Sequence, residues 1–265
     1  MPSIEYSMMQ TVSVGPSPRL ALSVMGAGEL VLFLHGIGGR RQNWDAQLAF
    51  FSKHYKAAAW DARGYGDSED YGGPLDFTVF SDDILRVLDH FGTRKAHLVG
   101  LSMGGRIARN FALRHPERLH SLTLANTSPG FGVMGPEKVR QFVEQRRRFD
   151  PPTQARSILG PDAPASAYET LVASLSAVHR DSYMKTIEAS VAQDLAAPIE
   201  KIAVRTLVIT STHDSLYPRA VGEAMAQRIP NARLAVIERA GHLSNLEKPA
   251  EFNRIVLEFI GDARS

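Results

Sequence analysis

The segment GLSMGG at residues 100–105 constrains the fold of this chain more than any other stretch. An apolar run of strand type, residues 96–99, precedes it, and apolar side chains recur at helical spacing in residues 106–113. We therefore expect Ser102 at a sharp turn from a strand into a helix, where its glycine neighbours let strand and helix approach closely. Such a turn strains the backbone of the serine and directs the positive end of the helix at its hydroxyl group. The G-x-S-x-G spacing in this setting predicts a nucleophilic serine.

The rest of the chain alternates between strand-like and helix-like segments. Residues 4–25 alternate loosely between apolar and polar side chains and are broken by prolines, which predicts an antiparallel hairpin at a sheet edge. Further strands are expected at residues 30–34, 55–60, 96–99, 122–125, 206–210 and 234–237, and helices at residues 77–91, 106–113, 219–229 and 246–260. Strands that alternate with helices predict an α/β fold with a mostly parallel central sheet and helices on both faces.

One block of the sequence departs from this alternation. From residue 130 to residue 197 the strand patterns vanish, and the apolar spacing becomes helical with proline-rich interruptions. We interpret residues 130–197 as an inserted helical cap. The α/β core is then expected to consist of residues 1–129 and 198–265.

The composition excludes several classes of function. Lysine and arginine number 30 and aspartate and glutamate 28 among 265 residues, so the formal net charge of +2 offers no basic excess for binding nucleic acid. The absence of cysteine excludes disulfides, thiolate metal sites and a cysteine nucleophile. No apolar run approaches the about 20 residues of a membrane helix, and residues 1–6 lack signal-peptide features. We expect a cytoplasmic protein, a monomer or a homodimer, that acts on a small molecule and binds neither nucleic acid nor membrane.

A nucleophilic serine needs a base to take its proton, and the base needs an acid to orient it. In chains with this strand-to-helix serine, the acid and then the histidine follow in sequence. Asp214 comes just after the strand expected at residues 206–210, and His242 just after the one at residues 234–237. Because parallel strands end at one edge of a sheet, these side chains are expected to meet Ser102 there. On residue type alone, the rival groups are Asp61, Asp67, Asp82, Asp83 and His213.

The negative oxygen of a tetrahedral intermediate needs two backbone N–H donors. The N–H of Met103, the residue after the serine, is predicted to supply one. The second is expected from Ile37 in the glycine-rich loop after the first buried strand, and His35 is expected to brace that loop. Trp44 and Tyr217 are candidates for lining the substrate pocket, although large apolar residues more often serve core packing.

Five segments together resemble the α/β-hydrolase superfamily over nearly the whole chain. They are HGIGG (35–39), DARGYGDS (61–68), GLSMGG (100–105), STHDSLYP (211–218) and AGHLSNLEKP (240–249). Within the superfamily the chain is most similar to the 3-oxoadipate enol-lactonase group. The resemblance implies a serine hydrolase without cofactor or metal, which cleaves a small ester or lactone in aromatic degradation. It also implies an acyl-enzyme on Ser102, with Asp214 and His242 completing the triad.

The resemblance leaves the substrate open, because residues 130–197 match no cap motif. Arg146 in the basic run Arg146–Arg148 either receives a substrate carboxylate, as an enol-lactone acid would require, or belongs to a solvated helix face. The same triad would also serve C–C bond hydrolysis of a ring-cleavage dienoate. A non-catalytic ligand-binding protein on the same fold is the alternative from a different class.

Overall fold

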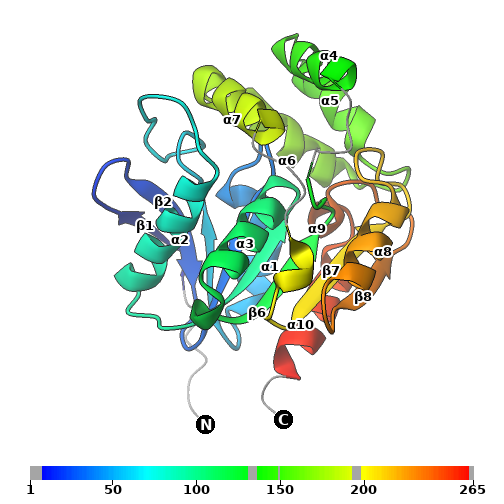
Figure 1. Cartoon of the computed structure of the whole chain (residues 1–265). Helices are drawn as coiled ribbons and strands as arrows, with labels where there is room; N and C mark the ends of the chain where they lie inside the picture. Colours follow the sequence, from blue (N-terminus) through cyan, green and yellow to red (C-terminus); the bar gives the residue numbers. More distant parts are fainter. Residues whose placement is uncertain (1–7, 131–135, 149, 193–197, 263–265) are drawn as a thin grey trace.

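The computed structural model describes residues 8–130, 136–148, 150–192 and 198–262. Its centre is an eight-stranded sheet in the order β1-β2-β4-β3-β5-β6-β7-β8 (Figure 1). The strands are β1 (Gln10–Val14), β2 (Leu20–Met25), β3 (Leu30–Leu34), β4 (Lys56–Trp60), β5 (Ala96–Leu101), β6 (Leu119–Ala125), β7 (Thr206–Ser211) and β8 (Arg233–Ile237). β1 pairs with β2 and β2 with β4 in antiparallel fashion, whereas the other neighbouring strands are parallel. The mostly parallel sheet is confirmed, and so is the edge hairpin for residues 10–25; residues 4–7 lie outside the described residues.

Helices cover both faces of this sheet. The helices of the described chain are α1 (Asp45–Phe51), α2 (Thr78–His90), α3 (Met103–Arg114), α4 (Pro136–Arg147), α5 (Pro151–Ile158), α6 (Ala165–Ser176), α7 (Arg180–Ala192), α8 (Arg219–Arg228), α9 (Ser244–Glu247) and α10 (Pro249–Gly261), with 3-10 turns η1 (Arg41–Trp44), η2 (Pro116–Arg118) and η3 (Ile199–Lys201). Side chains of α2, α3 and α8 pack into the core on one face, and those of α1 and α10 into the core on the other. The predicted helices on both faces are therefore present.

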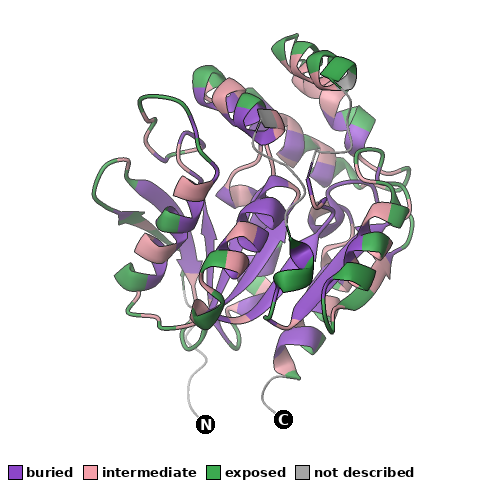
Figure 2. Ribbon diagram, viewed as in Figure 1, coloured by how far each residue is buried: buried purple, intermediate pink, exposed green. Residues whose placement is uncertain are grey.

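Strand β3 explains why both faces need cover. Leu30, Leu32 and Leu34 belong to the core under α2 and α3, whereas Val31 and Phe33 belong to the core under α1 and α10. All five side chains are fully buried, as expected of a central strand in a parallel sheet. Figure 2 shows the buried strands enclosed by helices that expose their outer sides. A continuous apolar run in the sequence thus reports burial on both faces.

The end of the chain differs from the expectation. The sequence predicts one helix over residues 246–260, whereas the structure has α9 and α10 separated at Lys248. Pro249 lacks a backbone N–H and disfavours the helical conformation in the residue before it, and Lys248 accordingly has φ −134° and ψ 58°. Because of this break α9 ends at Glu247, next to the loop that carries His242.

Helices α4–α7, hereafter the inserted helices, come between β6 and β7 in the chain and lie together at the top of Figure 1. In this group α4 packs against α7, and α5 packs against α6. Among the hydrogen bonds that tie the group to the core, Asn43 Nδ2 donates to Ser174 Oγ (2.9 Å), and Arg106 Nη2 donates to the Ser190 carbonyl oxygen (2.8 Å). Outside the described residues lie 131–135, 149 and 193–197 of the expected cap. The boundaries between core and cap stay a prediction.

Two further observations concern the described residues alone. No helix among them combines the length and the apolar composition that crossing a membrane requires. No group of three or more His, Asp or Glu side chains among them is arranged to hold a metal ion.

Candidate active site

Ser102 lies between the end of β5 and the start of α3, at the sharp turn that the sequence predicts. Its backbone has φ 56° and ψ −115°, a conformation that is uncommon for any residue other than glycine. Three hydrogen bonds hold it there: Ser102 N–H donates to the Ala125 carbonyl oxygen (2.9 Å), and the Ser102 carbonyl oxygen accepts from Thr127 Oγ1 (2.7 Å) and Arg106 N–H (3.1 Å). The strained conformation is therefore fixed by the neighbouring strand and helix.

The glycines around Ser102 are needed because two backbone segments cross there. A Cβ atom on Gly100 would overlap the Gly104 carbonyl group, and a Cβ atom on Gly104 would overlap the Leu34 carbonyl oxygen. Any side chain at either position would push α3 away from β3 and β5. The motif therefore reports a tight crossing as well as a nucleophile.

Asp214 and His242 form a buried pair at the ends of β7 and β8, with 5% and 3% of their surface exposed. His242 Nδ1 lies 3.1 and 3.0 Å from the two carboxylate oxygens of Asp214, and the N–H groups of Leu216 and Tyr217 donate to Oδ1 at 2.9 Å. Burial by itself would raise the pKa of Asp214, but His242 and hydrogen bonds from Tyr217 and Asn126 hold that pKa below its ordinary value. An ionised carboxylate only accepts hydrogen bonds, so His242 carries its proton on Nδ1 and keeps Nε2 as an acceptor.

Asn126 is a residue of this site that the sequence analysis missed. It follows β6 in a left-handed backbone conformation (φ 44°), which asparagine tolerates better than most residues. Its Nδ2 donates to Asp214 Oδ2 (3.1 Å) and Ser211 Oγ (2.9 Å), while its Oδ1 accepts from Ser244 Oγ (2.6 Å). Asn126 thereby joins the loop of the acid to the start of α9. The available signal was a polar residue directly after a buried strand.

The loop after β3 is held by His35, as expected. His35 Nδ1 donates to the Gly36 carbonyl oxygen (2.8 Å), and Nε2 accepts from Ala62 N–H (3.0 Å). Burial lowers the pKa of His35, which favours the neutral ring that this pattern requires. The Gly36 carbonyl oxygen also accepts from Gly39 N–H (3.0 Å). Because a trans peptide directs its N–H opposite to its carbonyl group, the Ile37 N–H points away from these two donors.

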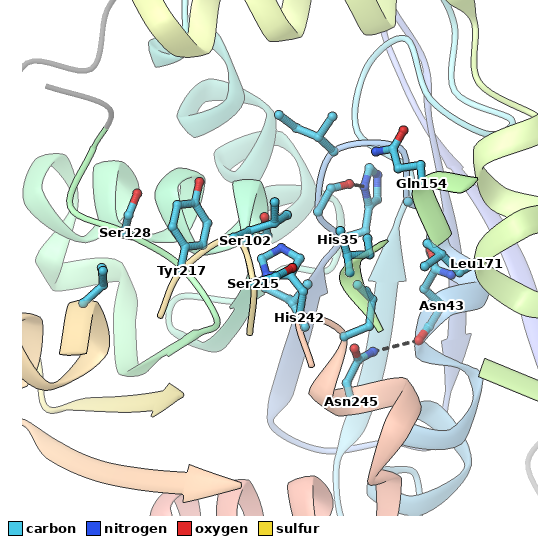
Figure 3. Close-up of a pocket in the computed structure, with 18 of the residues that line it drawn as sticks. His35, Asn43, Ser102, Ser128, Gln154, Leu171, Ser215, Tyr217, His242 and Asn245 are labelled. Carbon is cyan, nitrogen blue, oxygen red and sulfur yellow. Dashed lines mark hydrogen bonds between the residues drawn. The ribbon is translucent and has the colours of Figure 1, made fainter. Parts of the chain in front are cut away.

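A cavity of about 570 Å³ lies between the strand ends and the inserted helices, and both Ser102 and His242 line it (Figure 3). Trp44, Arg146 and Tyr217, the three predicted substrate contacts, line the same cavity. Trp44 also packs against Phe33 and Phe252, so its side chain belongs to the core as well as to the cavity lining. The Tyr217 ring lies 5.6 Å from that of His242. The structure thus brings together groups from segments far apart in the sequence.

Several cavity-lining polar atoms are buried without a hydrogen-bond partner in the described residues. They are Ser128 Oγ, Trp44 Nε1 and Asn245 Oδ1. Ser128 and Asn245 are labelled in Figure 3. Buried polar groups in proteins are normally satisfied, so these three atoms are exceptions among the described residues around the cavity.

The rival acids have other partners. Asp61 and Asp67 bind the guanidinium group of Arg41, and the buried carboxylate of Asp83 binds Arg63 and Arg86. The remaining rivals are Asp82, which contacts Arg114, and His213, which is exposed and lies outside the cavity lining. Of the carboxylates considered, only Asp214 contacts a histidine that lines the cavity.

Arg146 differs from the two arginines that follow it. Among the residues described as lining the cavity, it is the only Arg, Lys, Asp or Glu. Its guanidinium carbon lies 5.0 Å from the centre of the Phe142 ring, and it offsets part of the rise that burial causes in the pKa of Tyr183. Arg147 instead contacts Glu144 and Glu188 on the exposed surface. Of the basic run, Arg146 alone presents a positive charge to the cavity.

Comparisons with known proteins show the family and the fold of this chain. The sequence pattern described as the alpha/beta hydrolase family matches residues 31–255. 3-Oxoadipate enol-lactonase 2 of Acinetobacter baylyi is 28% identical over 232 residues, which cover 85% of this chain and 86% of that protein. A solved hydrolase from Pseudomonas aeruginosa has 30% identity and a TM-score of 0.83 over 96% of this chain and 98% of that chain. The solved enol-lactonase from Burkholderia xenovorans has 28% identity and a TM-score of 0.81 over 92% and 96% of the two chains.

Proposed function

The chain belongs to the alpha/beta hydrolase family, and from this premise we propose that it cleaves a small carboxylic ester or lactone through an acyl-enzyme on Ser102. The observation that carries the proposal is that His242, which is paired with Asp214, lines the same cavity as the strained Ser102. Enol-lactonases among the similar proteins support a lactone as the substrate class.

In the first half of the reaction, His242 Nε2 takes the proton of Ser102 Oγ as this oxygen attacks the substrate carbonyl carbon. Asp214 keeps the imidazole in the tautomer that leaves Nε2 free and stabilises its positive charge. The intermediate collapses when the bond from carbon to the alcohol oxygen breaks, and His242 returns the proton to that oxygen. With a lactone, the alcohol stays attached to the acyl group.

The oxyanion of each intermediate is assigned to the N–H groups of Met103 and Ile37. Met103 is the first residue of α3, so its N–H has no partner within the helix. The peptide that carries the Ile37 N–H is oriented by His35 and Gly39 through its carbonyl oxygen. A donor of this kind is worth about 3 kcal/mol of barrier stabilisation.

In the second half, water replaces the alcohol. His242 takes a proton from the water as its oxygen attacks the acyl carbon, and the bond from carbon to Ser102 Oγ breaks. The proton passes to Ser102, and a carboxylic acid is released. The proposed reaction steps use no cofactor.

Arg146 is assigned to substrate binding, on the same proposal, as the group that receives a carboxylate of the substrate. Among the described residues that line the cavity, it is the only Arg, Lys, Asp or Glu. Guanidinium groups bind carboxylates in bidentate fashion. An enol-lactone acid has a carboxylate of this kind. Trp44 and Tyr217 supply aromatic surface to the same cavity.

The proposal is tested with a serine-directed fluorophosphonate probe and a substrate panel. The unaltered protein and Ser128→Ala, which removes another hydroxyl from the same cavity, should be labelled, whereas Ser102→Ala should not. Ester and lactone turnover should fall about 10⁴-fold or more in Ser102→Ala. Labelling that persists in Ser102→Ala would point to another nucleophile. Preference for a vinylogous diketone over an enol-lactone would instead favour C–C bond hydrolysis.

A further inference from the structure

Glu247, the last residue of α9, has a buried side chain that the proposed mechanism does not use. Its carboxylate accepts three backbone hydrogen bonds from two segments that lie far from each other in the sequence. Oε2 accepts from Gly241 N–H (2.9 Å) and from Gly160 N–H (2.8 Å), and Oε1 accepts from Leu243 N–H (3.1 Å). Two of these donors flank His242, and the third follows helix α5.

The backbone of His242 itself is bonded to the inserted helices. Its N–H donates to the carbonyl oxygen of Ile158, the last residue of α5 (2.8 Å). The N–H groups of residues 241, 242 and 243 therefore all have fixed acceptors, supplied by Glu247 and by α5. A nearby hydrogen bond from Ser215 Oγ to the Ser157 carbonyl oxygen (2.9 Å) links α5 to the loop of Asp214 as well.

The two segments that Glu247 joins are in direct backbone contact. A Cβ atom on Gly160 would lie 2.6 Å from the Gly241 nitrogen and 2.9 Å from Glu247 Oε2, closer than real Cβ atoms approach other atoms. Glycine at position 160 is thus required for the contact between the inserted helices and the histidine loop. Helix α5 also lines the cavity, through Gln154 and Ile158.

We propose that Glu247 is a positioning residue that fixes His242 against helix α5, so that the catalytic base and this wall of the substrate cavity are held as one unit. The inference rests on the proposed function, in which His242 is the base. Both carboxylate oxygens accept N–H groups, so a glutamine at this position would turn its NH₂ group towards at least one donor. A misplacement of the base by about 1 Å is enough to slow a reaction about 100-fold.

The test compares Glu247→Gln, Gly160→Ala and their double variant with the control Asp83→Asn. Asp83 is a buried carboxylate bound to Arg63 and Arg86, and it lies outside the cavity lining. The readouts are kcat and KM on the best ester or lactone of the panel, the urea midpoint, and the low-field proton resonance of the hydrogen bond from His242 Nδ1 to Asp214. The resonance reports the position of the imidazole without any turnover.

Glu247→Gln and Gly160→Ala should each lower kcat about 10- to 100-fold with KM changed less than threefold, and should shift or broaden the low-field resonance. In the double variant, kcat should fall little further than in the more impaired of the two single variants, because both substitutions break the same contact. Asp83→Asn should lower the urea midpoint and leave kcat and the resonance unchanged.

An unchanged kcat and resonance in folded Glu247→Gln would overturn the inference. If that variant does not fold, Gly160→Ala decides by the same criteria. His242→Ala separates this failure from failure of the proposed function: activity that survives in His242→Ala contradicts the function, whereas activity lost there and kept in both other variants contradicts only the role of Glu247.

Discussion

The carboxyl edge of the sheet and the inserted helices line one cavity, but they are built differently. At the edge, Asp214 and His242 are buried, and each has hydrogen bonds that fix its orientation. Across the cavity, Arg146 is only partly buried on α4, and its described contacts are with the aromatic side chains of Phe142 and Tyr183. On the proposed function, this difference assigns reaction geometry and substrate choice to separate parts of the fold.

Changes at the edge should therefore alter the rate of the chemical step, whereas changes on the inserted helices should alter the binding of particular substrates. Positions at the edge are fixed by strand ends and by tight backbone turns. Positions on the helices depend on side-chain length and charge, which substitution changes without disturbing the sheet. Two experiments test this separation, and a third tests how burial at the edge affects stability.

The largest effect is expected for Asp214→Asn. An asparagine of the same size leaves the geometry intact, but its amide group favours the wrong tautomer of His242, so kcat should fall about 10⁴-fold. KM should change little, because Asp214 is not among the residues that line the cavity. Steady-state kinetics on one ester and one lactone measures both constants. A rise in KM with kcat preserved would break the proposed separation.

A smaller and selective effect is expected for Arg146→Gln. Loss of the charged hydrogen bond should raise KM for a carboxylated lactone about tenfold, which corresponds to about 1.4 kcal/mol, and leave KM for a neutral ester unchanged. The matched control is Arg147→Gln, at the next position of the same helix. It should leave KM unchanged for both the carboxylated lactone and the neutral ester. Equal losses on both substrates would show that Arg146 serves packing.

The smallest effect is expected in the pH dependence of stability. Burial lowers the pKa of His35, so on acidification the unfolded chain takes up a proton at an ordinary imidazole pKa of about 6.5 before the folded protein does. The free energy of unfolding should therefore decrease as the pH falls through this range. Urea unfolding at pH 8 and pH 6 should show a smaller difference in His35→Gln than in the unaltered protein.

The control for this measurement is His54→Gln, because His54 is an exposed histidine in the turn between α1 and β4. It should keep the pH difference of the unaltered protein. If the free energy of unfolding changed equally between pH 8 and pH 6 in all three proteins, His35 would not contribute to the acid sensitivity of folding.

The positions of Ser102, Asp214 and His242 were predictable because each depends on one local pattern, a strand that ends in a polar turn. The strands before Ser102 and Asp214 are buried throughout, whereas the strand before His242 is buried only at its last residue. The sheet order then brings the three turns to one edge, and the fold class follows from the alternation of strands and helices. The structure confirms the predicted strands and the mostly parallel sheet. The catalytic roles stay proposals.

Asn126 and Glu247 were not predictable in the same way. Their hydrogen-bond partners lie up to 118 and 87 residues away in the sequence, and no local spacing encodes such contacts. Arg146 posed a different difficulty. Arg146 and Arg147 are consecutive on helix α4 and point in directions about 100° apart, and only the packing of α4 against α7 decides which of them meets the cavity.

The backbone crossing at Gly160 and Gly241 sets a rule for exchanging segments between relatives of this protein. Neither residue tolerates a side chain, and the histidine loop relies on the carbonyl oxygen of Ile158. A chimera that imports a foreign α4 and most of α5 should therefore be spliced before residue 158. Such a graft keeps the native junction while it changes the wall that meets the substrate.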